Sequence, residues 1–325
     1  MAIFTKLKSE EIKLFFNQYN TSVVEEYLPI HLGIQNSNYF IKTKSKTYIL
    51  TIFEDNKIIR KLEFYFNLLD FLHTKGFCNP YPIQTIKGKR KSIISKKTAA
   101  VFNFIKGDSL KKSNSKHLFE LGSVIASMHI KSKNFKYYKG NEYSFNYWTL
   151  NRRKLSIEIE KKQLGLNSLI KQDLSAFQKL DNLNLPRGII HADLFPDNVL
   201  FGNNKIKGIL DYYYSCKDYL IIDLAIIIIS WCFYKSSSNK LEINKLKIKN
   251  LLKGYNTIRK INNKELESLN IYCRLYAIRF FLSRMITAKL KHDPSKVTTK
   301  RPEEYIKKFL YFKKHKIKFE NLIKS

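Results

Sequence analysis

The segment 188–224 constrains the fold of this 325-residue chain more than any other. An apolar run ends at His191 and opens the sequence HADLFPDN, which carries Asp193 and Asn198. A polar turn and a second apolar run follow, and that run ends at Asp211. Two short strands joined by a tight turn place these carboxylate and amide side chains at one end of the pair. Such hard oxygen donors suit Mg²⁺, which takes a few protein ligands together with substrate phosphates.

The spacing matches the catalytic loop of protein kinases, H-R-D-x-x-x-x-N followed by a metal-binding Asp. Ala192 replaces the Arg of that pattern, and Asp211-Tyr212-Tyr213 stands where protein kinases have Asp-Phe-Gly. No A-P-E segment follows, and the short stretch before Asp218 leaves no room for an activation loop and a peptide platform. The pattern therefore indicates a kinase of small molecules.

The same pattern assigns chemical roles to the side chains. Asp193 is the candidate general base, which accepts the hydroxyl proton as the substrate oxygen attacks the γ-phosphorus of ATP. Asn198 and Asp211 are the candidate ligands of the Mg²⁺ ion that bridges the ATP phosphates. A solvated loop position is the alternative for Asp193, and Asp197 is its competitor as the base.

Two further residues of this segment are expected to support the loop. The ring of His191 is expected to hold the loop through hydrogen bonds. Asp223 lies in an apolar helical run, where an unpaired carboxylate would be costly, so we expect it to hydrogen-bond the catalytic loop.

The chain as a whole shows two parts with different patterns. Up to Gly107, helical periodicity alternates with short β-rich runs, whereas long helical stretches dominate afterwards. We therefore expect an α+β protein with a small β-rich lobe over residues 1–104 and a larger, mainly α-helical lobe over 105–325. The expected helices are 12–19, 57–75 with Gly76 as C-cap, 117–132, 151–180 and most of the chain from 219 onward. The expected strands are 39–41, 48–53 and short pieces within 79–107 and 186–215.

The charge of the chain is strongly positive, with 59 Lys and Arg against 27 Asp and Glu and a formal net charge of +32. Such a charge suits an anionic partner such as nucleic acid, a membrane surface or a phosphorylated small molecule. The lysines are spread over the whole chain rather than clustered, so compositional background explains most of them better than a nucleic-acid footprint.

The expected compartment is the cytoplasm. The four cysteines are widely spaced with no C-x-x-C pair, which argues against a disulfide scaffold or a zinc module and favours reducing conditions. The first residues lack the apolar run of a signal peptide. The most apolar stretch, 219–234, is shorter than a spanning helix and contains Asp223, so we expect a buried helix.

Seven segments spread over nearly the full length of the chain carry a resemblance to a known family. They are GIQNSNYFIKT, YILTIFE, AAVFNFIKGDSL, HADLFPDNVLF, GILDYYYSCKDYLIIDLAI, AIRFFLSR and RPEEYIKKF. Through them the sequence resembles the aminoglycoside phosphotransferase and choline kinase-like family. The resemblance implies a bilobal protein-kinase-like fold, with a nucleotide-binding first lobe and a catalytic, substrate-binding second lobe. It also implies transfer of the γ-phosphoryl group of ATP, with Mg²⁺, to a small alcohol. The branch most similar to this chain acts on L-homoserine, on the route to threonine.

The nucleotide site implied by this resemblance lies in the first lobe. Thr51 occupies the position where the family's phosphate-contacting lysine is expected, and no other residue is assigned that role. The candidate residues are Gly33, Asn36, Ser37 and Asn38 around the phosphates and Phe102 and Phe104 at the adenine. The backbone groups of the two phenylalanines are expected to face adenine, and core packing is the alternative for their side chains.

The substrate pocket is assigned from the chemistry of a zwitterion. Arg279 and Arg284 lie at helical spacing, and one of them is expected to clamp a carboxylate. Surface exposure is the alternative for these arginines. Tyr212, Tyr214 and Trp231 are candidate pocket walls, with core packing as the alternative.

Two rival functions stay open at this point. One is the same fold acting on another small alcohol, such as choline, methylthioribose or an aminoglycoside. The other is a basic nucleic-acid-binding protein, or a kinase-like fold that binds without catalysis.

Overall fold

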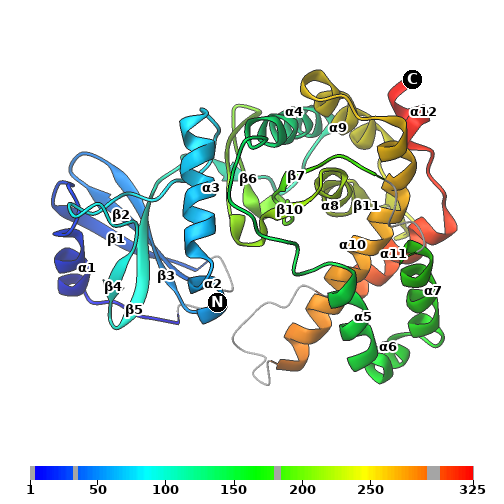
Figure 1. The fold of residues 1–325 in the computed structure, drawn as a ribbon, viewed down its shortest axis with the longest axis horizontal. Helices are drawn as coiled ribbons and strands as arrows, with labels where there is room; N and C mark the ends of the chain where they lie inside the picture. The colour runs from blue at the N-terminus through cyan, green and yellow to red at the C-terminus, as the bar shows by residue number, and fades with distance from the viewer. Residues whose placement is uncertain (1–3, 32–35, 179–183, 291–300, 325) are drawn as a thin grey trace. The chain divides into compact units, whose positions relative to one another are not determined.

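The computed structural model describes residues 4–31, 36–178, 184–290 and 301–324, which fall into two compact units (Figure 1). The first unit holds the described residues up to Gly107 together with Lys207–Tyr213. The second unit holds the rest of the described chain.

The first unit is built on a five-stranded antiparallel sheet with strand order β1-β2-β3-β5-β4. The expected hairpin is confirmed, because β2 and β3 pair with Asn38 opposite Thr51. The strands are β1 (Val24–Ile30), β2 (Asn36–Thr43), β3 (Thr47–Phe53), β4 (Ser92–Ile94) and β5 (Lys97–Asn103).

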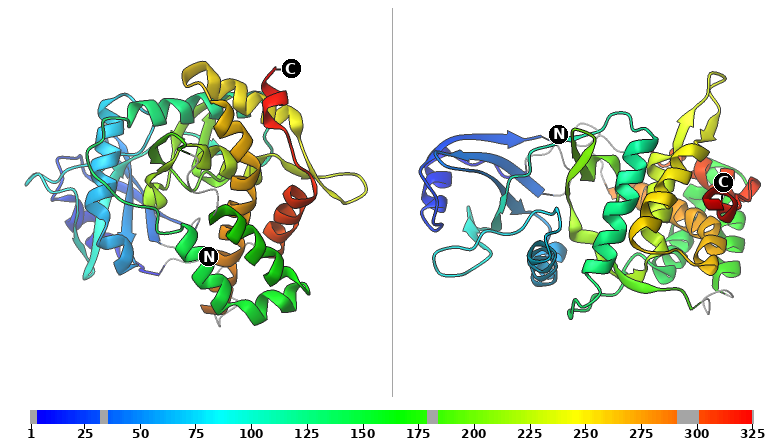
Figure 2. Two further views of the ribbon diagram at one scale, coloured as in Figure 1. Left: turned by 45° about the vertical axis from the view of Figure 1, so that its right-hand side comes forward. Right: turned by 90° about the horizontal axis from the view of Figure 1, so that it is seen from above.

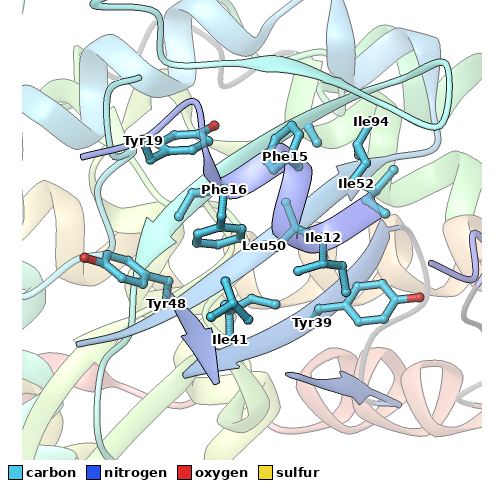
Figure 3. Packing of buried hydrophobic residues seen from close by; sticks show 13 residues of the cluster. Ile12, Phe15, Phe16, Tyr19, Tyr39, Ile41, Tyr48, Leu50, Ile52 and Ile94 are labelled. Atoms are coloured by element: carbon cyan, nitrogen blue, oxygen red, sulfur yellow. The ribbon is translucent and has the colours of Figure 1, made fainter. Parts of the chain in front are cut away.

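Helix α1 (Ser9–Phe16) covers one face of this sheet. Ile12, Phe15 and Phe16 of the helix pack against a row of alternate strand residues that includes Leu50 and Ile52 (Figure 3). Successive strand residues point to opposite faces, so the intervening positions, Thr51 among them, belong to the other face.

Helix α3 (Leu62–Thr74) packs against that other face, since Phe66 lies with its ring 6.4 Å from Phe53 and 6.1 Å from Phe102. The sequence predicts one helix over 57–75, but the structure has a short α2 (Asn56–Ile59) and a break before α3. The end of the helix is confirmed: Gly76 has φ +66°, and the N–H of Phe77 reaches back to the carbonyl of Leu72 at 3.0 Å.

The second unit is mainly helical, with α8 (Ile221–Trp231) at its centre. Within it, every residue except Ser230 is buried, so the apolar run forms the buried helix expected from the sequence. The other helices are α4 (Ser115–Lys131), α5 (Phe145–Lys154), α6 (Ser156–Lys162), α7 (Leu166–Gln178), α9 (Lys245–Ile258), α10 (Asn263–Leu290), α11 (Glu303–Lys314) and α12 (Phe319–Lys324). None of the helices in the described ranges is both long and apolar enough to cross a bilayer.

Helices α4 and α9 lie side by side (Figure 2), and their backbones come close at a glycine on each helix. A Cβ on Gly122 would meet the carbonyl oxygen of Leu251 at 2.1 Å, and one on Gly254 would meet that of Phe119 at 1.9 Å. The close approach of the two backbones therefore depends on glycine at both positions.

Short strands interrupt the helices of the second unit. Almost wholly helical structure was predicted from 219 onward, but the structure contains the hairpin β11–β12, which projects from the unit (Figure 2). The strands are β6 (Asp108–Ser109), β7 (Arg187–Ile190), β8 (Val199–Gly202), β10 (Cys216–Tyr219), β11 (Phe233–Lys235) and β12 (Leu241–Ile243), with β9 (Lys205–Ile209) running on into the segment 207–213.

Candidate active site

The catalytic loop begins where β7 ends, and a buried carboxylate holds its first residues. Asp223, in the first turn of α8, accepts the backbone N–H of His191 and that of Ala192, both at 2.8 Å. The Nδ1 atom of His191 accepts the N–H of Asp193 at 3.3 Å. These contacts are the ones that a supporting role for Asp223 and His191 requires.

Ala192 adopts a left-handed conformation with φ +64°, which is uncommon for a residue other than glycine. The conformation costs of the order of 1 kcal/mol and persists where the surroundings enforce it. Both ends of the residue are held, because its N–H donates to Asp223 and its carbonyl accepts from Nη1 of Arg279 at 2.9 Å. The bend directs the chain into Asp193.

The side chain of Asp193 is partly exposed and is bonded by Asn198. Nδ2 of Asn198 donates to the Asp193 carbonyl at 2.8 Å and to its Oδ2 at 3.1 Å. Asn198 reaches this position because Pro196–Asn198 form a single turn of 3-10 helix. Asp197, the competitor for the role of base, is exposed on the same turn.

The loop is also fixed from the side of α8. The indole N–H of Trp231 donates to the carbonyl of Leu194 at 2.9 Å, and the ring is buried. The structure thus gives Trp231, a candidate pocket wall, a packing position beneath the loop.

The second carboxylate of the pattern, Asp211, lies in the segment 207–213 of the first unit and has φ +63°. The ring of Tyr213 in this segment packs edge-on against Phe53 at 6.1 Å and Tyr65 at 5.5 Å. The N–H of Ile209 donates to a carbonyl of the same unit, that of Cys78, at 2.9 Å. Tyr212, a candidate substrate residue, is buried.

The candidate phosphate residues have unequal positions. Gly33 lies outside the described residues. Ser37 is buried, and its hydroxyl donates to Oε1 of Glu54 at 2.7 Å while accepting the N–H of Thr5 at 3.0 Å. Asn38 accepts the hydroxyl of Thr51 at 2.8 Å on the sheet face opposite α1. Asn36 is buried at the start of β2.

The two phenylalanines at the end of this unit also differ. Phe102 is buried against Phe66, whereas Phe104 is 39% exposed and packs edge-on against Phe40 at 5.3 Å.

Glu54 and Lys97 form an ion pair that was not predicted from the sequence. Burial would raise the pKa of Glu54, but hydrogen bonds from Lys97, Ser37 and Thr5 hold it below its usual value. Lys97 lies on the same face of β5 as Ala99 and Val101, the face covered by α1. Thr51, which stands where the family's phosphate-contacting lysine is expected, lies on the opposite face, so Lys97 does not take the place of that lysine.

The two candidate substrate arginines have different surroundings. Arg284 forms an ion pair with Glu304 at 3.1 Å and lies 4.0 Å from the ring of Tyr305. Arg279 is 2% exposed and contacts the catalytic loop through Ala192. Of the two, Arg279 is the one that the structure brings to the loop.

A buried polar chain behind Asp223 was also missed. Nε2 of His129 lies 3.1 Å from Oδ2 of Asp223, and its Nδ1 lies 2.7 Å from the hydroxyl of Tyr255. Arg259 donates to that hydroxyl at 3.2 Å and is ion-paired with Glu265 at 2.9 Å. The only sign of this polar chain in the sequence is His129, on the apolar face of the helix predicted over 117–132. A histidine in that position is equally typical of a plain core residue.

Comparison with known sequences shows which protein family this chain belongs to. A model of the phosphotransferase enzyme family matches residues 26–238. Homoserine kinase of Rhizobium meliloti (strain 1021) is 33% identical over 311 residues, which cover 96% of this chain and 94% of that protein. Homoserine kinase of Rhizobium etli (strain CFN 42) is 31% identical over 325 residues, which cover 100% of this chain and 98% of that protein.

Solved structures share the fold at lower identity. An amicoumacin kinase in complex with AMP-PNP, Ca²⁺ and Ami superimposes with a TM-score of 0.68 at 17% identity, over 95% of this chain and 92% of that one. Choline kinase of Streptococcus pneumoniae gives a TM-score of 0.61 at 19% identity, over 94% and 97% of the two chains.

The fold and the loop together define a phosphotransferase with a protein-kinase-like α+β architecture, which confirms the fold class expected from the sequence. The chain belongs to the phosphotransferase enzyme family, and within that family it groups with the homoserine kinases.

Proposed function

We propose that this chain transfers the γ-phosphoryl group of ATP to the hydroxyl of L-homoserine and forms O-phospho-L-homoserine, a step in threonine biosynthesis. The observation that carries the proposal is the loop in which Asp223 holds the N–H of Ala192 and Asn198 bonds the carboxylate of Asp193. The acceptor is inferred from relatives named homoserine kinases, which match this chain over nearly its full length.

Asp193 is the proposed general base. Its partly exposed carboxylate is held by Asn198 and accepts the proton as the homoserine oxygen forms a bond to the γ-phosphorus. The bond from that phosphorus to the β,γ-bridging oxygen breaks, ADP leaves, and Asp193 passes the proton to solvent. The protein contributes mainly by positioning the reactants and stabilising charge.

Mg²⁺ is the proposed metal, held by Asn198 and Asp211 with the ATP phosphates. The donor set fits, because both side chains offer oxygen and Asn198 turns its Nδ2 toward Asp193, which leaves Oδ1 for a cation. When bound, the ion neutralises charge on the phosphates. Within the described residues, no group of three or more His, Cys, Asp and Glu side chains forms a protein-only metal site.

The nucleotide is assigned to the first lobe and the acceptor to the second. The proposed contacts to the phosphates are Gly33, Asn36, Ser37 and Asn38. The hydroxyl of Ser37 is engaged with Glu54, so its contribution would come from its backbone. The proposed contacts to the adenine are Phe102 and Phe104.

The test is ATP consumption with L-homoserine by the wild-type chain, Asp193→Asn and the matched control Asp197→Asn. We expect Asp193→Asn to lower kcat about 10²–10⁴-fold, the usual contribution of a general base. The exposed Asp197 should be replaceable with little loss. Equal rates for wild type and Asp193→Asn would refute the assignment of the base.

The acceptor is tested in the same assay with choline, methylthioribose and an aminoglycoside. Turnover of one of these without turnover of L-homoserine would contradict the proposed substrate and favour the rival kinase function. Strong salt-dependent binding of nucleic acid without any phosphoryl transfer would contradict the enzyme assignment itself.

A further inference from the structure

The guanidinium group of Arg279 lies inside a cage of aromatic rings in the second unit. The arginine is on α10, and its side chain is almost fully buried. Aromatic faces attract a cation within about 6 Å of the ring centroid. The four rings and their distances from the guanidinium carbon are Phe280 at 4.4 Å, Tyr143 at 4.9 Å, Tyr214 at 5.3 Å and Tyr276 at 5.7 Å.

This cation has no acidic partner in the described part of the chain. Its one hydrogen bond runs from Nη1 to the carbonyl of Ala192, and its buried Nε has no acceptor among the described residues. Three other arginines of the second unit each meet a carboxylate. These are Arg259 with Glu265 at 2.9 Å, Arg274 with Asp173 at 2.8 Å and Arg284 with Glu304 at 3.1 Å.

An arginine stays protonated at every physiological pH, so it cannot escape burial by losing its charge. A buried charge without a partner is costly, and such a site is complete only when an anion joins it. The planar fork of N–H groups matches the geometry of a carboxylate or a phosphate, and the proposed acceptor carries a carboxylate.

We propose that Arg279 binds the carboxylate of the acceptor amino acid while its Nη1 stays on the carbonyl of Ala192. This inference rests on the proposed function, because it concerns the acceptor of that reaction. Ala192 directly precedes Asp193, so a carboxylate on Arg279 is anchored beside the base that takes the hydroxyl proton. Homoserine carries its carboxylate and its hydroxyl on one short chain, so an anchored carboxylate limits how far the hydroxyl can move from this base.

The same arrangement discriminates against cationic acceptors. A cage of tyrosines and a phenylalanine would suit a quaternary ammonium group, as in choline recognition. Here the guanidinium occupies that place, so a second cation would meet a buried like charge. The cage therefore favours an acceptor that carries a carboxylate over choline or an aminoglycoside.

The competing explanation is that Arg279 only supports the loop through Ala192. A comparison of two acceptors separates the explanations: L-homoserine, and 3-aminopropan-1-ol, which is homoserine without its carboxylate. Each is assayed with wild type, Arg279→Met and Arg279→Lys. The matched control is Arg284→Met on the same helix, whose arginine already has a carboxylate partner.

For the wild type, we expect kcat/KM for L-homoserine to exceed that for 3-aminopropan-1-ol by about 10⁴-fold, the scale of a site built to bond a polar group. In Arg279→Met this ratio should fall to near one, mainly through the KM for homoserine, whereas Arg284→Met should keep it. Arg279→Lys should restore part of it, since charge returns without the fork.

Equal losses for both acceptors in Arg279→Met would overturn the proposal and leave Arg279 as a loop support. Failure of the proposed function is seen separately, as absence of homoserine turnover by the wild type. In that event, calorimetric binding of L-homoserine to wild type and Arg279→Met decides the inference: loss of binding in the variant supports it, and unchanged or absent binding refutes it. Tryptophan fluorescence and a thermal melt verify that each variant is folded.

Discussion

Oδ1 of Asp223 accepts the backbone N–H of Ala192 at 2.8 Å, at a point where neither group is reached by solvent. This bond ties the central helix of the second unit to the residue that precedes the proposed base. The other carboxylate oxygen accepts from His191 and lies beside His129, so the carboxylate satisfies several buried groups at once.

Asp223→Ala should destabilise the chain by about 3–5 kcal/mol, because it leaves the buried N–H groups and His129 without their acceptor. Asp223→Asn keeps one acceptor oxygen and should cost less, while still lowering kcat more than it changes KM. Urea unfolding and steady-state kinetics measure the two effects. An Asp223→Ala chain as stable as Asp197→Asn would show that the bonds contribute nothing.

Ala192→Gly should fold normally and unfold at equal or higher urea concentration, because glycine adopts φ +64° without the strain of about 1 kcal/mol that alanine bears. Ala192→Val, with a β-branched side chain, should lose stability and phosphoryl transfer together. If valine were tolerated as well as glycine, the backbone at this position would not be constrained.

Gly254→Ala should destabilise strongly, since its Cβ would lie 1.9 Å from the carbonyl oxygen of Phe119 and the two helices would have to separate. The matched control is Gly140→Ala, whose Cβ would meet only the movable hydroxyl end of Tyr138 at 3.3 Å. We expect a difference of at least about 2 kcal/mol between them in chemical denaturation, in the range of overpacking penalties. Similar midpoints would contradict the close packing of α4 and α9.

Thiol reactivity should be low in the folded protein at pH 8. Burial raises the pKa of Cys216 to about 12 and that of Cys232 to about 12, so neither carries the reactive thiolate. Cys78 is partly exposed and should react first with iodoacetamide. Rapid labelling of Cys216 or Cys232 without denaturant would contradict this burial.

The same thiols predict how the stability of the folded chain changes at alkaline pH. Above pH 9 the unfolded thiols release protons that the folded ones retain, so the unfolded state binds fewer protons and stability falls as pH rises toward 12. Cys232→Ala should flatten this decline in urea midpoints between pH 8 and 10.5. An unchanged slope would mean that the Cys232 thiol is not shielded.

The parts of the fold that the sequence predicted are those where a local pattern suffices. The hairpin around Asn38 and Thr51 follows from alternating β-rich runs, and the buried α8 follows from its continuous apolar residues. The break between α2 and α3 and the hairpin β11–β12 were missed, because elements of three or four residues are too short to show a periodic pattern.

The site divides in the same way. The spacing of Asp193, Asn198 and Asp211 is a local pattern and could be interpreted from the sequence alone. The partners of Arg279 and Ser37 come from distant segments, so their burial and bonding are visible only in the structure. Helical spacing marked Arg279 and Arg284 equally. The structure distinguishes them, because Arg284 is paired with Glu304 whereas Arg279 is bonded to Ala192 of the loop.

The bond from Arg279 to Ala192 has a consequence for redesign of the enzyme. Removing the arginine to admit a neutral or cationic acceptor also removes the donor that restrains a strained peptide next to the base. A change of acceptor therefore requires another neutral donor that reaches the carbonyl of Ala192, or a glycine at 192 that needs no restraint. Under the proposed role of Arg279, one side chain therefore links the choice of acceptor to the conformation of the loop.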